Sequence, residues 1–450
     1  MADLIGSEEV RSVTEAALQA VEADGVEVLF VHEWNGLTRF AESAIHQSTA
    51  REDTGLKVRV VSGGRVGVAS SNEFSKDGAA EAARSAAELA QVAAPDPAFP
   101  GLAPPAEAEE KPEAFDAASA ASTPEDRAEA VAALVSSLDR GFHAAGAFEA
   151  TASEVAVANS EGQFVWAPMT QAQVTSVVSG GDGGAGFAEM TAPRLSDIDP
   201  TAIGARAFAK ARDSQEPRDL EPGRYEVVLD PPATATLLGF LAYMGFGGRA
   251  IAEGRSCFSG RLGERLMDEK VTIYDDALSA ETIGLAFDFE GTPKRRIDLV
   301  SRGVAVTGVH DRRSARQEGI ESTGHALPPP NTEGAFPLNM FMQPGEATVE
   351  EMIGATERGL LVTRFHYSNI VHPREAVITG MTRDGTWLIE NGEVKHPVKN
   401  FRFTQSIIEA LRDVDMVGRD TEIASEFFFS ASRVPGLRVT AFNFTGRSDH

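Results

Sequence analysis

Residues 225–265 read YEVVLDPPATATLLGFLAYMGFGGRAIAEGRSCFSGRLGER, and this stretch decides the predicted fold of the second half of the chain. It predicts a short strand at 226–229, a helix over 233–246 and an extended Gly/Ser segment that ends in a sharp turn. Asp230 is expected to cap the helix, because its carboxylate can accept from free N–H groups of the first turn. The helix is apolar on almost every face, so it is predicted to be buried all round. It contains no carboxylate, His, Lys, Arg or Cys, and this absence bears on function.

The composition predicts a soluble, cytoplasmic protein without nucleic-acid or membrane partners. A length of 450 residues allows two or three domains with large cores. The 41 basic and 67 acidic side chains give a net charge of −26, and such a surface repels phosphate backbones and anionic lipids. A single cysteine, Cys257, excludes a disulfide framework and a Cys-rich zinc site. We find no secretory signal, and no apolar run approaches the ~18 residues of a membrane span.

The pattern of apolar and turn residues predicts an α+β fold, with an α/β N-terminal region followed by a β-rich antiparallel C-terminal domain. Residues 1–94 predict a helix, four strands and a second helix, with the first two strands joined by a turn at Trp34-Asn35-Gly36. Residues 95–122 are rich in Pro, Ala and Glu and are interpreted as an exposed connector. Residues 123–218 form a second α/β segment of the N-terminal region, and residues 219–450 form the C-terminal domain.

Several motifs could carry chemistry, and for each of them a structural interpretation is favoured. Gly181–Gly186 matches G-x-G-x-x-G, but no helix follows it, so we predict a hairpin. His366 and His372 lack an evident third zinc ligand. Cys257 is interpreted as a buried thiol. The remaining candidates are a His310-Asp311 pair with Ser256, Ser259 or Ser314 as nucleophile, and the acidic pairs Asp275-Asp276 and Glu350-Glu351, interpreted as a turn and a solvated helix face.

The segment TGMTRDGTWLIENGEVKHPVKN, residues 379–400, is dense in turn and charged residues. Arg383-Asp384-Gly385 and Glu390-Asn391-Gly392 predict two tight turns, in which Gly supplies a positive φ. Turn geometry does not require the neighbouring arginines. We therefore expect Arg364, Arg383 and Arg402 to anchor a carboxylate or carbonyl groups of a peptide, or to make interface contacts.

Several long motifs, in order along almost the whole chain, resemble the TldD/PmbA (TldE) family, also called peptidase U62 or modulator of DNA gyrase. They are FSGRLGE (258–264), FDFEGTP (287–293), GLLVTR (359–364), TGMTRDGTWLIENGE (379–393), PVKNFRF (397–403) and, in the N-terminal region, GLKVRVVSGGRVGVAS (55–70). The resemblance implies a dimer. It also implies, in the TldD-type subunit, an HExxxH helix whose histidines bind zinc and whose glutamate activates water, together with a late cysteine.

Aligned on Phe258, the HExxxH positions fall on Gly239, Phe240 and Met244, and no cysteine follows Glu422. The resemblance therefore implies a TldE-type subunit, with no catalytic residue or metal of its own. Zinc is expected in a TldD-like partner, and this chain is expected to bind unfolded or short peptides and to help form the cavity. Arg261, in FSGRLGE, joins Arg364, Arg383 and Arg402 as a candidate peptide or interface contact. The alternatives are a homodimeric peptidase with another mechanism, involving His366, His372 or His310, and a stand-alone peptide-binding protein.

Overall fold

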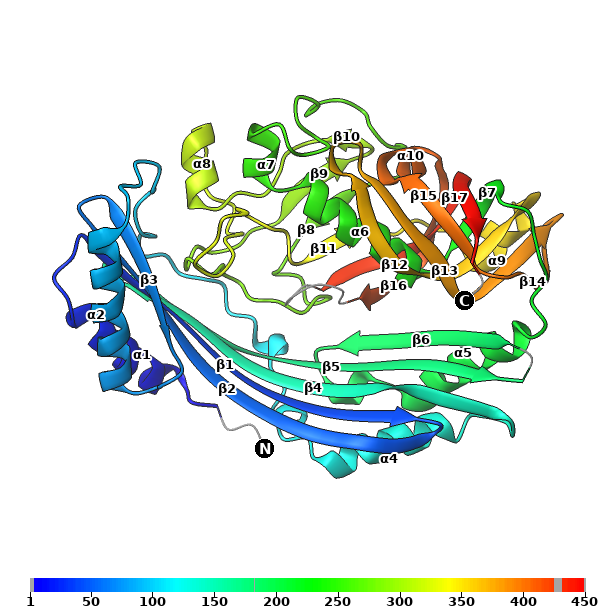
Figure 1. Ribbon diagram of the computed structural model, residues 1–450, viewed down its shortest axis with the longest axis horizontal. Helices are drawn as coiled ribbons and strands as arrows, with labels where there is room; N and C mark the ends of the chain where they lie inside the picture. Colours follow the sequence, from blue (N-terminus) through cyan, green and yellow to red (C-terminus); the bar gives the residue numbers. More distant parts are fainter. Residues whose placement is uncertain (1–3, 182, 425–430, 449–450) are drawn as a thin grey trace.

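The computed structural model describes residues 4–181, 183–424 and 431–448, which build two sheet-based regions (Figure 1). The N-terminal region contains a six-stranded antiparallel sheet in the order β3-β2-β1-β4-β5-β6. Its strands are β1 (Gly25–Ala41), β2 (Ala44–Ser62), β3 (Arg65–Ser71), β4 (Phe142–Asn159), β5 (Phe164–Gly180) and β6 (Gly184–Ala192). Because β1 pairs with β4, the segments predicted at 1–94 and 123–218 share this one sheet.

Both faces of the N-terminal sheet are buried over much of its area. Val28 and Phe30 of β1 pack with helices α1 (Ser7–Gln19) and α2 (Lys76–Val92). Leu29, between them, packs with Phe287 of the C-terminal domain, because consecutive strand residues point to opposite faces. Helices α4 (Pro124–Val135) and α5 (Pro200–Asp213) extend the helical layer. The sheet therefore lies between this layer and the C-terminal domain (Figure 1).

The predicted turn at Trp34-Asn35-Gly36 is wrong, because β1 runs through it without a break. Asn35 pairs with Arg51 of β2 and with Thr151 of β4, and its side-chain amide donates to Thr151 Oγ1 at 2.9 Å. Glycine is required at position 36 because a side chain would clash there: an added Cβ would lie 2.5 Å from Arg127 Nη1. The local Asn-Gly turn preference is overridden by pairing with two neighbouring strands.

The connector at 95–122 is irregular in the main but is not exposed throughout, which corrects the prediction. It contains the 3₁₀ turn η1 (Pro112–Ala114) and the short helix α3 (Ala117–Ala120). Leu102 and Ala103 are buried. Lys111 Nζ donates to the carbonyl oxygens of Ala277 and Thr282, at 2.7 and 3.1 Å. The connector thus packs along the junction between the N-terminal region and the C-terminal domain.

The C-terminal domain is built on an eleven-stranded mixed sheet. Its main order is β10-β9-β8-β11-β17-β15-β13-β12-β7, with β14 on β13 and β16 on β17. The pairs β12–β7 and β11–β17 are parallel and the other pairs are antiparallel, so the predicted antiparallel pairing holds for most of this mixed sheet. The α+β class is confirmed. Since β7 also pairs with β17, the strands β17-β15-β13-β12-β7 close into a ring.

The strand bounds of this domain are β7 (Gly223–Leu229), β8 (Ile273–Asp275), β9 (Ile297–Ser301), β10 (Val304–Ala305), β11 (Met340–Met342), β12 (Arg358–His372), β13 (Val377–Glu390), β14 (Glu393–Pro397), β15 (Phe401–Ser406), β16 (Val414–Ala424) and β17 (Ser432–Arg447). Its helices are α6 (Pro231–Gly245), α7 (Gly248–Ala252), α8 (Arg312–Glu318), α9 (Val349–Gly354) and α10 (Ile407–Arg412). Two 3₁₀ turns, η2 (Leu195–Asp197) and η3 (Pro373–Glu375), complete the secondary structure described. In those described residues, no helix has both the length and the apolarity needed to cross a membrane.

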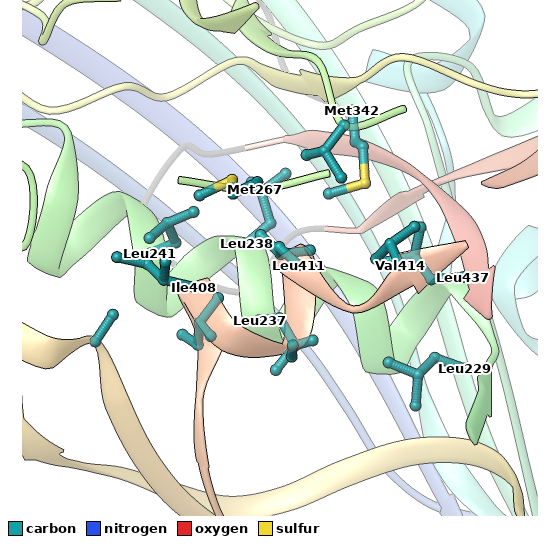
Figure 2. Packing of buried hydrophobic residues seen from close by; sticks show 14 of the residues in the cluster. Leu229, Leu237, Leu238, Leu241, Met267, Met342, Ile408, Leu411, Val414 and Leu437 are labelled. Carbon is teal, nitrogen blue, oxygen red and sulfur yellow. The ribbon is translucent and has the colours of Figure 1, made fainter. Parts of the chain in front are cut away.

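Helix α6 forms the centre of the largest core, and its predicted burial is confirmed except on the side of Phe240, which is half-buried, and Tyr243, which is exposed. Leu237, Leu238 and Leu241 pack against Met267, Met342, Ile408, Leu411 and Leu437 from four separate parts of the chain (Figure 2). Burial of each leucine contributes about 1.5–3 kcal/mol. The core therefore explains the uniformly apolar sequence of the helix.

Two local predictions for this domain are wrong. Gly284–Phe287 forms no strand, although Phe287 makes an isolated bridge to Pro293. Arg383-Asp384-Gly385 is a bulge within continuous β13, with positive φ at Asp384 and Gly385, and is not a turn between two strands. The second predicted turn, at Glu390-Asn391-Gly392, is confirmed as the turn of the β13–β14 hairpin.

Candidate functional site

The start of α6 is tied to the N-terminal region by Asp230. This residue is at the N-cap, but its side chain does not cap the helix as predicted. Its Oδ2 accepts a hydrogen bond from Lys210 Nζ of α5 at 2.6 Å. The backbone carbonyl of Asp230 accepts from the N–H groups of Ala233 and Thr234. The carboxylate therefore links α6 to the N-terminal region.

The three positions aligned with the zinc motif lie in the second half of α6. Gly239 and Met244 are buried, whereas Phe240 is half-buried. Tyr243, on the same helix, is 61% exposed, so this side of α6 is open to solvent. Neither glycine nor phenylalanine offers a ligand atom, and a methionine thioether suits softer ions than zinc. These side chains do not fit a zinc ion.

No group of three His, Cys, Asp or Glu side chains that could hold a metal occurs within 4–181, 183–424 and 431–448. His366 and His372 both lie on β12, and the backbone between them is bulged, with a positive φ at Tyr367. Burial and the nearby Arg364 and Arg383 lower the pKa of His366. The structure therefore brings no third ligand to these histidines in the part of the chain that it describes.

The FSGR segment holds the C-terminal end of α6 in place. Ser256 Oγ donates to the carbonyl of Gly245 at 2.6 Å and accepts from the N–H of Phe258 at 2.9 Å. Phe258 stacks on Phe246, with ring centroids 5.1 Å apart. Cys257 is buried as predicted, and burial raises the pKa of its thiol to about 12. A hydroxyl and a thiol used in this way support the fold and are not nucleophiles.

The His310-Asp311 pair does not form a triad with a serine. Asp311 Oδ1 accepts from the backbone N–H and the hydroxyl of Ser314, both at 2.7 Å, and so caps α8. His310 is buried beside Gly248, and burial lowers the pKa of its imidazole. Ser259 Oγ donates to the carbonyl of Ile251 at 2.8 Å. The aspartate therefore orients a helix and not a catalytic histidine.

A buried polar cluster in the C-terminal domain was missed by sequence reasoning. Asp275, predicted in a turn, is fully buried in β8, and its Oδ1 lies 3.0 Å from His325 Nε2. Its Oδ2 accepts from the N–H of Asn339 at 2.7 Å, and Lys294 Nζ donates to Asn339 Oδ1 at 3.1 Å. Burial alone would raise the pKa of Asp275, but His325, Lys294 and these hydrogen bonds outweigh burial and lower it. The cluster is satisfied internally, which indicates a structural role.

A second buried cluster joins the N-terminal sheet to the C-terminal domain. Arg59 of β2 lies 3.5 Å from Glu27 Oε1 and 3.3 Å from Glu290 Oε1. Asp288, in the FDFEGTP segment, accepts backbone hydrogen bonds from Glu290, Thr292 and Ala326. Burial raises the pKa of both Glu27 and Asp288 to about 7. This cluster holds more carboxylates than arginines, so it retains a proton near neutral pH.

The four candidate arginines fall into different environments. Arg364 forms an ion pair with Asp384 through Nε at 2.7 Å and through Nη2, and its guanidinium stacks over Phe187 of β6 at 4.0 Å. It therefore joins the two regions of the chain. Arg261 forms an ion pair with Glu264 at 3.3 Å on the surface, and Arg402 is exposed on β15.

Arg383 borders a cavity of about 420 Å³ at the junction of the two regions. The lining residues are Gly183, Ala185, Ser214 and Pro217 from the N-terminal side, and Arg383, Asp384, Gly385, Thr386, Val398, Lys399, Asn400 and Ser448 from the C-terminal domain. Gly183 belongs to the glycine-rich segment that joins β5 to β6, and strand β6 follows it, so the predicted hairpin is confirmed. Asp182 lies outside the described residues.

Three family models together match most of the chain. They are the PmbA/TldA metallopeptidase domain 1 over residues 26–90, the central domain over 103–215 and the C-terminal domain over 222–446. A metalloprotease of Methanothermobacter thermautotrophicus is 26% identical over 290 residues, covering 61% of this chain. The chain spans 62% of that relative's length.

Metalloprotease PmbA of Escherichia coli O157:H7 is 24% identical over 447 residues, which covers 95% of this chain and 94% of the relative. The crystal structure of TldE from Thermococcus kodakarensis superposes with a TM-score of 0.87 at 21% identity, over 97% of this chain and 100% of that one. This likeness extends across both regions and supports the fold described above. The C-terminal family model alone covers half of the residues, and the chain belongs to the PmbA/TldD family.

Proposed function

We propose that the chain is the zinc-free subunit of a two-subunit peptidase of the PmbA/TldD family. In this proposal it binds unfolded or short peptides and helps to enclose them, while a TldD-like partner holds the zinc ion. The observation that carries the proposal is the occupancy of the zinc-motif positions on α6 by Gly239, Phe240 and Met244, none of which suits zinc. We therefore assign no catalytic residue to this chain.

The far end of β12 supports the expected partner contact. In the described part of the chain, β7 pairs with β12 only over Gly359–Val362, which leaves the rest of that edge without a strand on that side. Along this stretch Tyr367 is 73% exposed and Val371 is 54% exposed. An unpaired edge with large exposed apolar side chains is a place where a second chain docks. We assign this edge to the partner subunit.

The proposal is tested by expressing the chain alone and together with a TldD-like protein that carries HExxxH and a late cysteine. We expect co-purification, zinc in the complex, and none retained by the lone chain after dialysis. Cleavage of unfolded peptide should require both chains and be lost on treatment with a chelator. Val371→Lys should weaken assembly, whereas Val92→Lys, at the 82% exposed last residue of α2, should not.

Three results would contradict the proposal. Stoichiometric zinc in the lone chain, with peptidase activity that disappears in His366→Ala, would assign the metal to this subunit. Cleavage of peptide by the lone chain without any effect of a chelator would favour the homodimeric peptidase with another mechanism. Peptide binding by a chain that never assembles with a TldD-like protein would favour a stand-alone binding protein.

A further inference from the structure

We infer that the cavity beside Arg383 is a binding site for a carboxylate. The carboxylate belongs either to the C-terminus of a peptide or to a free small carboxylic acid. A cavity of about 420 Å³ lies within the range of small-ligand pockets, and its walls come from both regions of the chain. The peptide form of this inference rests on the proposed function, whereas the free-acid form does not.

The N–H groups of the Arg383 guanidinium are available to bind a ligand. The neighbouring Asp384 is already engaged by Arg364, which reaches its Oδ2 with two N–H groups. Arg383 Nε lies 3.8 Å from Asp384 Oδ1, which is too far for a hydrogen bond, and its side chain is 37% exposed. No hydrogen bond from the Arg383 guanidinium is found among the described residues. The planar fork of an arginine matches the two oxygens of a carboxylate.

The charges around the cavity favour a single negative charge. Arg364 and Asp384 neutralise each other, and Lys399 forms an ion pair with Asp219 at 3.2 Å. Of the two cations among the described residues that line the cavity, Arg383 and Lys399, Arg383 is the one that makes no hydrogen bond to a carboxylate. A dianion such as phosphate would meet the nearby carboxylates of Asp384 and Asp219, so a monoanionic carboxylate suits the site better.

A buried hydroxyl at the cavity wall adds a second polar group. Thr386 is 2% exposed, and its Oγ1 has no hydrogen-bond partner among the residues that the structure describes. Buried polar atoms are nearly always hydrogen-bonded, so the unpaired hydroxyl of a residue that lines the cavity supports a polar ligand there.

The test measures binding to the full-length chain alone by isothermal titration calorimetry. The probes are trialanine, its C-terminal amide, N-acetylalanine and inorganic phosphate. We expect trialanine to bind at least about tenfold more tightly than its amide, because the amide lacks the charge that pairs with the guanidinium. Binding of both trialanine and N-acetylalanine supports a peptide terminus as a ligand, and binding of N-acetylalanine alone restricts the site to free acids.

Arg383→Gln should weaken binding of the acid probes by about tenfold or more while leaving the far-UV spectrum and melting temperature unchanged. The matched control is Arg358→Gln, because Arg358 also lies 3.8 Å from an acidic side chain, that of Glu390, but does not line the cavity. It should bind like the wild type. Equal binding of acid and amide, tighter binding of phosphate, unchanged affinity in Arg383→Gln or no binding of any probe would overturn the inference. Because no partner subunit is present, these outcomes are independent of whether a zinc-bearing complex forms.

Discussion

The buried cluster of Glu27, Arg59, Asp288 and Glu290, here called the junction cluster, makes the free energy of unfolding fall as the pH rises. Most carboxylates in folded proteins have the opposite effect. Glu27 is fully buried, and its pKa is raised to about 7. Burial is the main cause; the nearby Arg59 lowers the pKa, and the carboxylates of Glu290 and Asp288 raise it further. The folded state thus binds a proton more tightly than the unfolded state. Its contribution to stability is complete below pH 4.5 and is lost as the pH rises through about 7.

The size of the change in stability follows from the pKa shift of the one proton that the cluster shares. A pKa that moves from 4.5 to about 7 corresponds to about 3 kcal/mol of stabilisation that disappears on deprotonation. Asp288 is coupled to the same cluster, and Arg59, Arg312 and Glu290 supply its remaining charges, so we count this proton once. We expect the free energy of unfolding to fall by about 3 kcal/mol between pH 5 and pH 8.5.

Urea unfolding followed by tryptophan fluorescence at a series of pH values measures this dependence. Glu27→Gln cannot ionise, so it should flatten the dependence over this range and exceed the wild type in stability at pH 8.5. Glu88→Gln, on the exposed side of α2, makes the same change in charge and should leave the slope unaltered. An unchanged pH slope in Glu27→Gln would refute the assignment of the proton to this cluster.

Three further predictions follow from packing. Cys257 should resist iodoacetamide in the folded protein and react on addition of urea, because burial raises its pKa to about 12; rapid native alkylation detected by mass spectrometry would contradict this. Gly36→Ala should cost about 1–3 kcal/mol in urea unfolding, since its Cβ would lie 2.5 Å from a buried arginine, whereas Gly55→Ala on β2 meets open space. Arg364→Met removes the hydrogen-bonded partner of the 4% exposed carboxylate of Asp384, leaves only the more distant Arg383 among its described ion-pair partners and should cost about 3 kcal/mol; adding Asp384→Asn should recover part of this loss, and no recovery would argue against the ion pair.

The parts of the fold that were predictable are those encoded locally. Helix α6 is apolar over its whole length, and the glycine pair at 63–64 marks the β2–β3 hairpin without help from other segments. The continuity of β1 could not be predicted, because Asn35 and Gly36 are held by strands from elsewhere in the chain. Local turn preferences, worth little individually, are outweighed by two sets of ladder hydrogen bonds.

The candidate site shows the same division between local and distant information. The absence of zinc ligands on α6 is visible in the sequence, because it needs only the identity of Gly239, Phe240 and Met244. The role of Asp275 was invisible, since its partners His325 and Asn339 lie at least 50 positions away. Arg364 was expected to contact peptide, but its ion pair with Asp384 becomes apparent only when a bulge brings the two side chains together.

The position of β17 in the C-terminal sheet determines the order in which the two regions can fold during synthesis on the ribosome. All strands of the N-terminal sheet lie within residues 25–192, so its pairing can be completed while later residues are still being synthesised. The C-terminal domain cannot do the same, because β17 pairs with β7, β11, β15 and β16. Strand β7 emerges about two hundred residues before this partner and must be kept from wrong pairings until then. The pairing of β7 is therefore complete only after β17 has been synthesised.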